Sequence, residues 1–514
     1  MEQSNKKTIA KNTVFLYIRM LLSTIVSLYT SRVVLQTLGV EDYGIYGVVG
    51  GVVTMLSFLN ASMSGATSRF LTVAIGKGDT KKLKDTFSSA LNIHIAIAII
   101  MFIFAETVGL WFLCNKLVIP AERMVAAHVV YQFSIIGTLL SITQVPYNAV
   151  IIAHEKMDIY AYIELLNVFL KLGIVYLLVI CNWDKLILYA GLTLCVSILI
   201  LCIYRLYCIK QYEETKYHFI WDKELVKPML SFSGWDLYGN MSVVFFTQGI
   251  TMLLNMFFGP ALNAANNVSM TVQGTIKAFA FNVIQAFRPQ IIKQYSQGCL
   301  EAVNQYCTMA TQYTLILFAM IAIPFIIETR FILDLWLGLI PEHTIFFLRI
   351  ILIGTIFNLA NNIVNIPLHA CGRMKFFSIA TGTCFWVSIP LMFLLLKLGT
   401  SADLSYLVVI FAYLSCLTVA LCVLKRNVPE FRIRVLLFQG YFKCVLCCIP
   451  GIAISWGVSN ILEEGFIRII SITLLNALSL LVCTLYIIMN KSERSKCFTT
   501  VRSKLSKKYF LWED

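Results

Sequence analysis

The chain has 514 residues, of which 59% are hydrophobic and only 13% are charged, and its mean hydropathy is +0.79. A soluble domain of this size cannot bury so much apolar surface, so the composition excludes a soluble fold and indicates an integral membrane protein. The net charge of +14 is compatible with a nucleic-acid partner, but most Lys and Arg residues fall on segments predicted to be cytoplasmic, as the positive-inside rule requires. No nucleic-acid partner is therefore expected.

Apolar runs long enough to cross a bilayer follow one another along nearly the whole chain. Since each spanning helix needs about 20 residues, we expect about fourteen transmembrane helices. Lys6, Lys7 and Lys11 precede the first run, which lacks a small-residue cleavage site, so both termini are expected in the cytoplasm. The predicted spans are 13–38, 44–69, 86–113, 126–152, 159–181, 186–208, 229–258, 265–292, 306–335, 343–370, 376–396, 403–424, 436–459 and 466–490.

An internal repeat relates the two halves of the chain. The pattern of residues 12–85 recurs about 220 residues later, so that Gly39 matches Gly259 and Arg69 matches Arg288. A repeat unit of six spans, an even number, gives both halves the same orientation, with a pseudo-twofold axis along the membrane normal. This predicts an all-α membrane fold of two six-helix lobes plus two extra C-terminal helices, with a central cleft for alternating access.

The repeat divides the chain into five parts. They are the N-terminal lobe (1–208), a cytoplasmic interlobe linker (209–228), the C-terminal lobe (229–425), transmembrane helices 13 and 14 (426–490) and a basic cytoplasmic tail (491–514).

Polar and cationic residues inside the spans are the candidates for substrate binding. Span 343–370 carries four asparagines on one helical face, and amides in lipid need partners or a wet cavity. Cations inside the spans outnumber carboxylates, so such a cavity favours an anion. For Arg69 and Arg288, anchoring at the cytoplasmic interface is the alternative role. The candidate substrate-binding residues are Arg19, Arg69, Lys277, Arg288, Asn358, Asn361, Asn362 and Asn365.

Two carboxylates, Asp236 and Glu164, are candidates for ion coupling. Glu164 and Lys171 lie about 10.5 Å apart along one helix face, so other helices must satisfy them. Because no metal-ligand spacing, phosphate loop or nucleophile elbow is placed where it could act, we expect no metal, no cofactor and no enzymatic activity.

The stretch from Ser31 to Phe70, with its "LGVEDYGIYG" turn, resembles the Wzx-type polysaccharide flippases of O-antigen and capsule pathways. These belong to the superfamily that also holds the MATE exporters. The resemblance covers nearly the whole chain. It implies a bacterial inner-membrane transporter that flips a polyprenyl-pyrophosphate-linked oligosaccharide to the periplasmic leaflet, with membrane lipid and other polysaccharide-assembly proteins as partners.

Two other functions remain open. A cation-coupled MATE-class multidrug exporter often carries a carboxylate in a lobe core, whereas spans 13–38 and 44–69 contain none. Asp236 and Glu164 keep this alternative open. A membrane glycosyl-polymerase or ligase would need a large outer loop with catalytic residues, and the outer loops here are short.

Overall fold

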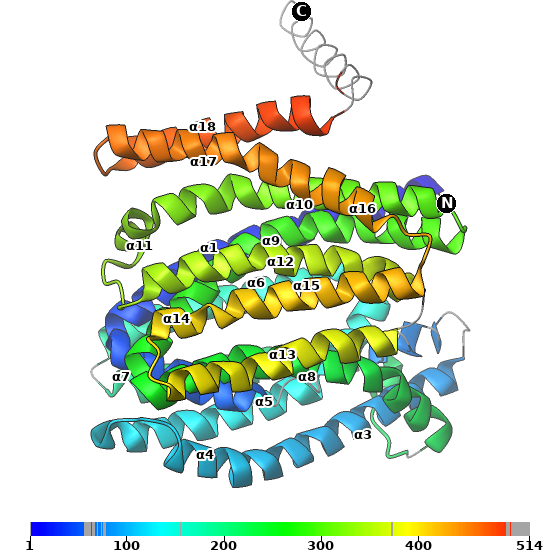
Figure 1. Ribbon diagram of the computed structural model, residues 1–514. Helices are drawn as coiled ribbons and strands as arrows, with labels where there is room; N and C mark the ends of the chain where they lie inside the picture. The colour runs from blue at the N-terminus through cyan, green and yellow to red at the C-terminus, as the bar shows by residue number, and fades with distance from the viewer. Residues whose placement is uncertain are drawn as a thin grey trace, which may run out of the picture. The chain divides into compact units, whose positions relative to one another are not determined.

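The computed structural model describes residues 2–55, 63, 67–68, 70–72, 74–75, 79–154, 156–181, 183–220, 222–371, 374–489 and 494. All regular structure in these residues is helical (Figure 1). The helices are α1 (Glu2–Thr54), α3 (Thr80–Phe104), α4 (Leu110–Asn115), α5 (Met124–Ala153), α6 (Met157–Ile180), α7 (Lys185–Gln211), α8 (Lys223–Phe258), α9 (Pro260–Ser296), α10 (Leu300–Ile327), α11 (Thr329–Leu337), α12 (Thr344–Ala370), α13 (Met374–Lys397), α14 (Ala402–Tyr406), α15 (Val408–Asn427), α16 (Ile433–Val435), α17 (Lys443–Ile461) and α18 (Phe466–Cys483). Three π-helical segments, Ala105–Gly109, Leu436–Phe442 and Thr484–Ile488, interrupt or extend them.

Within the described residues, eleven helices are long and apolar enough to cross a membrane. Each overlaps one of eleven predicted spans, although the predicted span 306–335 is wrong at its end, because α10 stops at Ile327 and the rest of the span falls on α11. The other three predicted spans, 13–38, 44–69 and 265–292, fall on α1 and α9, and part of 44–69 lies outside the described residues. The protein is therefore an all-helical, multi-pass membrane protein.

The chain forms two compact units. The first contains Met1–Val272, Asp334–Ile350 and Met374–Cys416, and the second contains Gln273–Leu333, Ile351–Arg373 and Leu417–Asp514. Boundaries between the units fall within α9, α11, α12 and α15.

Two glycines that the repeat pairs have the same backbone conformation. Gly39 divides α1 into two arms with φ 80° and ψ 170°. Gly259 separates α8 from α9 with φ 81° and ψ −173°. A positive φ is costly for any residue with a Cβ, so glycine is required at both turns. The matching geometry supports the internal repeat.

A glycine stripe on the second arm of α1 allows close packing in the first unit. Gly44, Gly47 and Gly51 face Pro260, Asn267 and Gln248 respectively, and a Cβ on any of these glycines would collide with its neighbour. Their spacing places them on one helical face. The second arm of α1 therefore lies directly against α8 and the start of α9.

Arg123 ties three segments of the first unit together. Its guanidinium donates to Asp42 on α1, with Nε 2.8 Å from Oδ1, and to Asp184 before α7, with Nη1 2.6 Å from Oδ2. Burial raises the pKa of Asp42. Burial also opposes ionisation of Asp184, but hydrogen bonds from Arg123 and the Ile187 amide outweigh it, so the pKa of Asp184 is lowered. Asp42 belongs to the "LGVEDYGIYG" turn, which this network holds in place.

The connection between α7 and α8 lies against α3 in the same unit. The Asn92 side chain donates to the Ile220 carbonyl at 2.6 Å and accepts from the Tyr217 hydroxyl at 2.7 Å. His218 also contacts Asp85, with Nε2 2.9 Å from Oδ1. This connection falls within the predicted linker 209–228.

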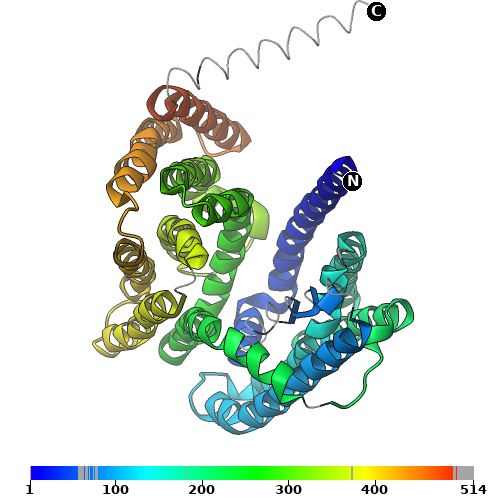
Figure 2. The same ribbon diagram turned by 90° about the vertical axis from the view of Figure 1, so that its right-hand side faces the viewer.

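In the second unit, α17 and α18 run side by side and both pack against α10 (Figure 2). Arg468 of α18 pairs with Glu328 at the end of α10 at 2.6 Å, and their side chains are 11% and 1% exposed. Asn476 of α18 donates to the Met320 carbonyl at 3.2 Å. Arg468 also lies 3.4 Å from Glu464, but Glu328 Oε1 and Arg468 Nε have no hydrogen-bond partner among the described residues. Separating the two buried charges is therefore costly, because little else compensates them.

We expect Gly47→Ala to impair folding or function because the added methyl group must displace Asn267. Gly50→Ala is the matched control, because a Cβ there meets nothing within 4 Å. Overpacking costs about 1–3 kcal/mol, so the thermal unfolding midpoint of purified Gly47→Ala should fall while that of Gly50→Ala stays at or above the parent value. Equal midpoints for the two variants would contradict the close packing.

We also expect Arg468→Met to be strongly destabilising, at a cost of about 3–5 kcal/mol, because it leaves the buried Glu328 carboxylate without a cation. Glu328→Gln should cost less, because Arg468 keeps Glu464 at 3.4 Å. The double variant should be more stable than Arg468→Met, because no unpaired buried carboxylate remains. Thermal unfolding of the four proteins in the same detergent measures this coupling, and additive losses would show that the two side chains act independently.

Candidate functional site

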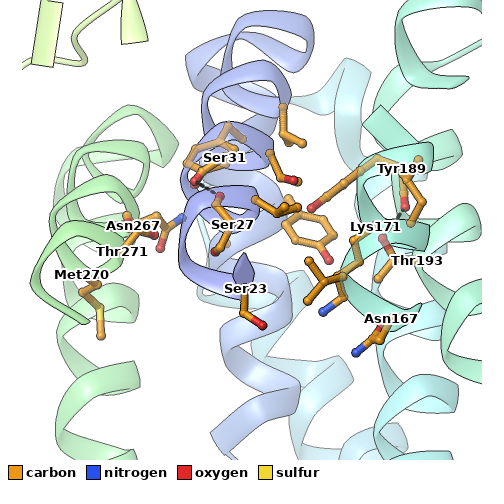
Figure 3. A pocket seen from close by; sticks show the side chains of 18 of the residues that line it. Ser23, Ser27, Ser31, Asn167, Lys171, Tyr189, Thr193, Asn267, Met270 and Thr271 are labelled. Carbon is orange, nitrogen blue, oxygen red and sulfur yellow. Dashed lines mark hydrogen bonds between the residues drawn. The ribbon is translucent and has the colours of Figure 1, made fainter. Parts of the chain in front are cut away.

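A polar cavity of about 720 Å³ lies within the first unit (Figure 3). Its walls come from both arms of α1 and from α6, α7 and α9. Figure 3 shows Asn267 and Thr271 of α9 on one side of the α1 serines and Lys171 of α6 on the other. The volume lies within the range of about 300–1,000 Å³ found for small-ligand sites.

Serines along the first arm of α1 form one wall. Ser23, Ser27 and Ser31 recur at four-residue intervals and therefore lie on one helical face. Thr30 also lines the cavity, and its buried hydroxyl has no hydrogen-bond partner in the described residues. Their spacing in the sequence places all four on one polar stripe of the helix.

The opposite wall carries the charged residues of the cavity. Glu164, Asn167 and Lys171 of α6 line it together. The Tyr204 hydroxyl on α7 lies 3.4 Å from Glu164, so another helix does contact this carboxylate, as expected. Lys171 is exposed and has no hydrogen bond or ion pair to any described residue. Its ammonium group is therefore free to meet an anion.

A second cavity, of about 460 Å³, shares part of its lining with the first. Tyr46, Gly47, Thr193, Asn267 and Met270 border both. Its remaining walls carry no charged side chain and are rich in hydroxyls and amides. The polar groups found only there are Thr54, Ser134, Thr138, Ser141, Ser197, Gln248 and Thr251.

Many of these hydroxyls already use their single donor within their own helix. Ser31 donates to the Ser27 carbonyl at 3.2 Å, Thr193 to the Tyr189 carbonyl at 2.8 Å, and Thr271 to the Asn267 carbonyl at 2.8 Å. A hydroxyl also has two lone pairs, so each still presents an acceptor to the cavity. Together with the donors of Lys171 and the amides, this arrangement can bind a ligand rich in hydroxyl groups.

The predicted residues Lys277 and Arg288 lie on α9 in the second unit. Lys277 is half-buried and has no partner among the described residues. Arg288 lies about 16 Å further along the helix, at 1.5 Å per residue, and lines a small cavity of about 40 Å³. The structure therefore places these two cations on one helix of the same unit.

Two of the four predicted asparagines meet Arg288 in that small cavity. Asn362 and Asn365 of α12 line it with Arg288. Asn362 also donates to the Asn358 carbonyl at 2.8 Å. The side-chain oxygens of Asn361 and Asn365 are buried without a hydrogen-bond partner among the described residues. An unsatisfied buried amide is costly, so these two oxygens are open to a donor from a ligand or water.

For three predicted residues, the structure describes no side-chain position. Arg69 lies outside the described residues, and so do the side chains of Arg19 on α1 and Asp236 on α8. In the described part of the chain, no group of three or more His, Cys, Asp and Glu residues could hold a metal ion.

Several cavity residues were not predicted from the sequence, chiefly Tyr43, Tyr46, Asn167 and Tyr189. One signal could have found Asn167, because it lies on the helical face shared by Glu164 and Lys171. Tyr46 and Tyr189 stand in apolar stretches of the sequence, and their rings pack edge to face with centroids 4.8 Å apart. No local pattern distinguishes such a cavity wall from a packed core.

Comparison with known proteins agrees with this architecture. The chain is 21% identical over 331 residues to the uncharacterized membrane protein EpsK of Bacillus subtilis (strain 168), a match that spans 62% of this chain and 63% of EpsK. The chain thus matches less than two thirds of the length of this relative.

Solved structures show the same fold at low identity. The lipid II flippase MurJ in an inward closed conformation superposes with a TM-score of 0.71 and 15% identity, covering 92% of this chain and 98% of MurJ. An inward-facing multidrug resistance MATE family transporter of the MOP superfamily gives a TM-score of 0.69 and 12% identity, covering 82% and 98%.

The family assignment comes from the sequence itself. The model of the family described as "Polysaccharide biosynthesis protein" matches residues 9–330, which is more than half of the chain. The chain therefore belongs to the polysaccharide biosynthesis protein family and has the fold of the MOP superfamily transporters.

Proposed function

We propose that this protein flips a polyprenyl-pyrophosphate-linked oligosaccharide from the cytoplasmic to the periplasmic leaflet of a bacterial inner membrane, by alternating access and without enzymatic chemistry. The observation that carries the proposal is the pair of adjoining cavities in the first unit, which are lined by hydroxyls and amides. Among the described residues that line them, Lys171 is the one cation, and it has no partner there. Membership of the polysaccharide biosynthesis family supports a glycan substrate.

Each part of this substrate has a matching group in the protein. Sugar hydroxyls need both donors and acceptors, which the serine, threonine and asparagine side chains of the cavities supply. The pyrophosphate needs cations, for which Lys171 now joins the sequence candidates Arg19, Arg69, Lys277 and Arg288. The polyprenyl tail remains in the lipid, where it costs no desolvation.

The membrane potential favours this direction of transport. A cell interior that is electrically negative drives an anion outward by about 2.3 kcal/mol per full charge across 100 mV. With both termini in the cytoplasm, as the basic segments predict, the substrate enters from the leaflet in which the carrier lipid is loaded. An ion gradient is therefore not required.

A cation-coupled exporter is the second candidate function. Glu164 lies in the cavity of the first unit, and a carboxylate there could carry a proton or bind a cation. Asp236 is a second sequence candidate for this role. Glu164→Gln separates the two functions, because it should abolish proton- or sodium-driven drug efflux but leave glycan flipping largely intact.

We expect the charge of Lys171 and Lys277 to matter more than their bulk. Lys171→Gln and Lys277→Gln should each reduce flipping roughly tenfold, the value of one charge-assisted hydrogen bond, whereas Lys171→Arg and Lys277→Arg should retain it. The measurement is accumulation of cytoplasmic-leaflet lipid-linked oligosaccharide at equal protein level. Lys397→Gln, at the exposed end of α13, is the matched control. Full activity in both glutamine variants would refute the cationic mechanism.

We further expect Asn361→Leu and Asn365→Leu to impair flipping with little loss of folded protein. Their side-chain oxygens have no partner to lose in the described residues, so leucine removes a ligand contact but no internal hydrogen bond. The same cell assay, combined with the thermal unfolding midpoint of the purified variants, tests this. Severe misfolding of both would instead assign these asparagines to helix packing.

A further inference from the structure

A separate polar cavity of about 380 Å³ lies in the second unit and shares no residue with the cavities described above. Its walls come from the first half of α10, the π-helical segment Leu436–Phe442, the start of α17 and the end of the π-helical segment Thr484–Ile488. We propose that it binds the phosphate headgroup of an anionic phospholipid, with Lys443 as the principal cation. This proposal does not depend on the transport function.

The polar lining on α10 is a continuous helical face. Glu301, Gln305, Thr308 and Gln312 recur at intervals of three and four residues and all border the cavity. A polar face on a helix with a strongly apolar composition needs partners, because lipid provides none. The cavity provides space for a ligand that supplies such hydrogen-bonding partners.

Most polar groups in this wall are already satisfied by the protein. Gln312 donates to the Gln439 carbonyl at 2.8 Å, Thr308 donates to the Asn304 carbonyl at 2.8 Å, and Asn304 accepts from the Arg432 amide at 2.9 Å. Lys443 and Gln305, in contrast, have no partner among the described residues. Those two side chains are therefore available to a ligand.

The charge balance singles out Lys443. Arg432 lies 3.8 Å from Glu301, and both side chains are largely exposed. Its charge is partly offset and well solvated, so it adds little to binding. Lys443 is half-buried and has no carboxylate partner in the described residues. A half-buried lysine without a counter-ion favours a bound anion.

Two π-helical segments border the cavity, Leu436–Phe442 through Gln439 and Thr484–Ile488 through Ile488. A π-helical turn costs helix stability and occurs frequently at functional sites. In the first segment, the Gln439 carbonyl accepts from Gln312, and this contact fixes the wall that precedes Lys443.

The surrounding charges and apolar side chains identify a lipid rather than a soluble ligand. Lys425 and Arg426 lie in the last turn of α15, and Arg434 lies on α16. These basic residues place this end of the unit in the cytoplasm by the positive-inside rule. Anionic lipids of that leaflet bind in basic pockets between transmembrane helices. Phe438 and Phe442, on the π-helical segment Leu436–Phe442, are 65% and 59% exposed. They offer an apolar surface for the acyl chains.

The test uses the full-length protein purified in a neutral detergent and titrated with phosphatidylglycerol or phosphatidylcholine. Bound lipid is counted by native mass spectrometry, and the thermal unfolding midpoint is followed in parallel. We expect phosphatidylglycerol to bind and raise the midpoint, and phosphatidylcholine to do so much less. Lys443→Gln should weaken phosphatidylglycerol binding roughly tenfold, the value of one charge-assisted hydrogen bond, while Lys443→Arg should preserve it.

Two further variants make the result decisive. Arg434→Gln removes a nearby exposed cation that does not line the cavity, and it should bind phosphatidylglycerol like the parent. Gln305→Glu places an anion at an exposed position of the wall and should abolish binding even if Lys443→Gln folds poorly.

Three results would overturn the site. The first is phosphatidylglycerol binding like that of the parent in both Lys443→Gln and Gln305→Glu. The others are a loss of phosphatidylglycerol binding in Arg434→Gln equal to that in Lys443→Gln, and binding of phosphatidylcholine equal to that of phosphatidylglycerol. Inorganic phosphate should bind far more weakly than the lipid because it has no acyl chains to bury. An equal rise in the midpoint with inorganic phosphate would overturn the lipid assignment in favour of a soluble anion.

Discussion

The contact between the second arm of α1 and the junction of α8 with α9 decides the geometry of the first unit. Gly44, Gly47 and Gly51 have no Cβ, so Pro260, Asn267 and Gln248 approach the α1 backbone directly. This close approach brings the amides of Asn267 and Gln248 to the cavity walls. A larger side chain at Gly44 would meet the Pro260 backbone and push the helices apart, and one at Gly47 or Gly51 would displace the Asn267 or Gln248 amide. Helix packing and ligand binding therefore depend on the same three positions.

Both units keep polar groups inside a strongly apolar chain, but they satisfy them in different ways. In the cavities of the first unit, the hydroxyls of Thr193 and Thr271 donate to their own helices, and their acceptors remain open. In the second unit, Arg468 and Glu328 form a buried ion pair that joins α18 to α10. The first arrangement suits the reversible binding of a hydroxyl-rich ligand. The second fixes the position of a helix.

The two proposed sites should hold their ligands with different strength. A transported substrate must bind weakly enough to leave, so a cavity with many modest hydrogen bonds and one free lysine is suitable. A structural lipid benefits from a local cation and apolar contacts, which Lys443 and Phe442 provide. Because the two sites share no residue, substitutions at Lys171 and Lys443 affect separate properties of the protein.

The amino-acid sequence is enough to predict the class of fold, the approximate positions of most spans, the glycine turns at Gly39 and Gly259, and the helical faces that carry Glu164, Lys171 and the α12 asparagines. These features follow from local composition and from the 3.6-residue period, which the chain encodes directly. The packing of the helices, in contrast, places Tyr43, Asn167 and Tyr189 in one cavity with the α1 serines and brings Arg288 to Asn362 and Asn365. Those groupings depend on which helices pack together and at what height, and a helix presents the same polar face whether a cavity or a neighbouring helix lies beside it.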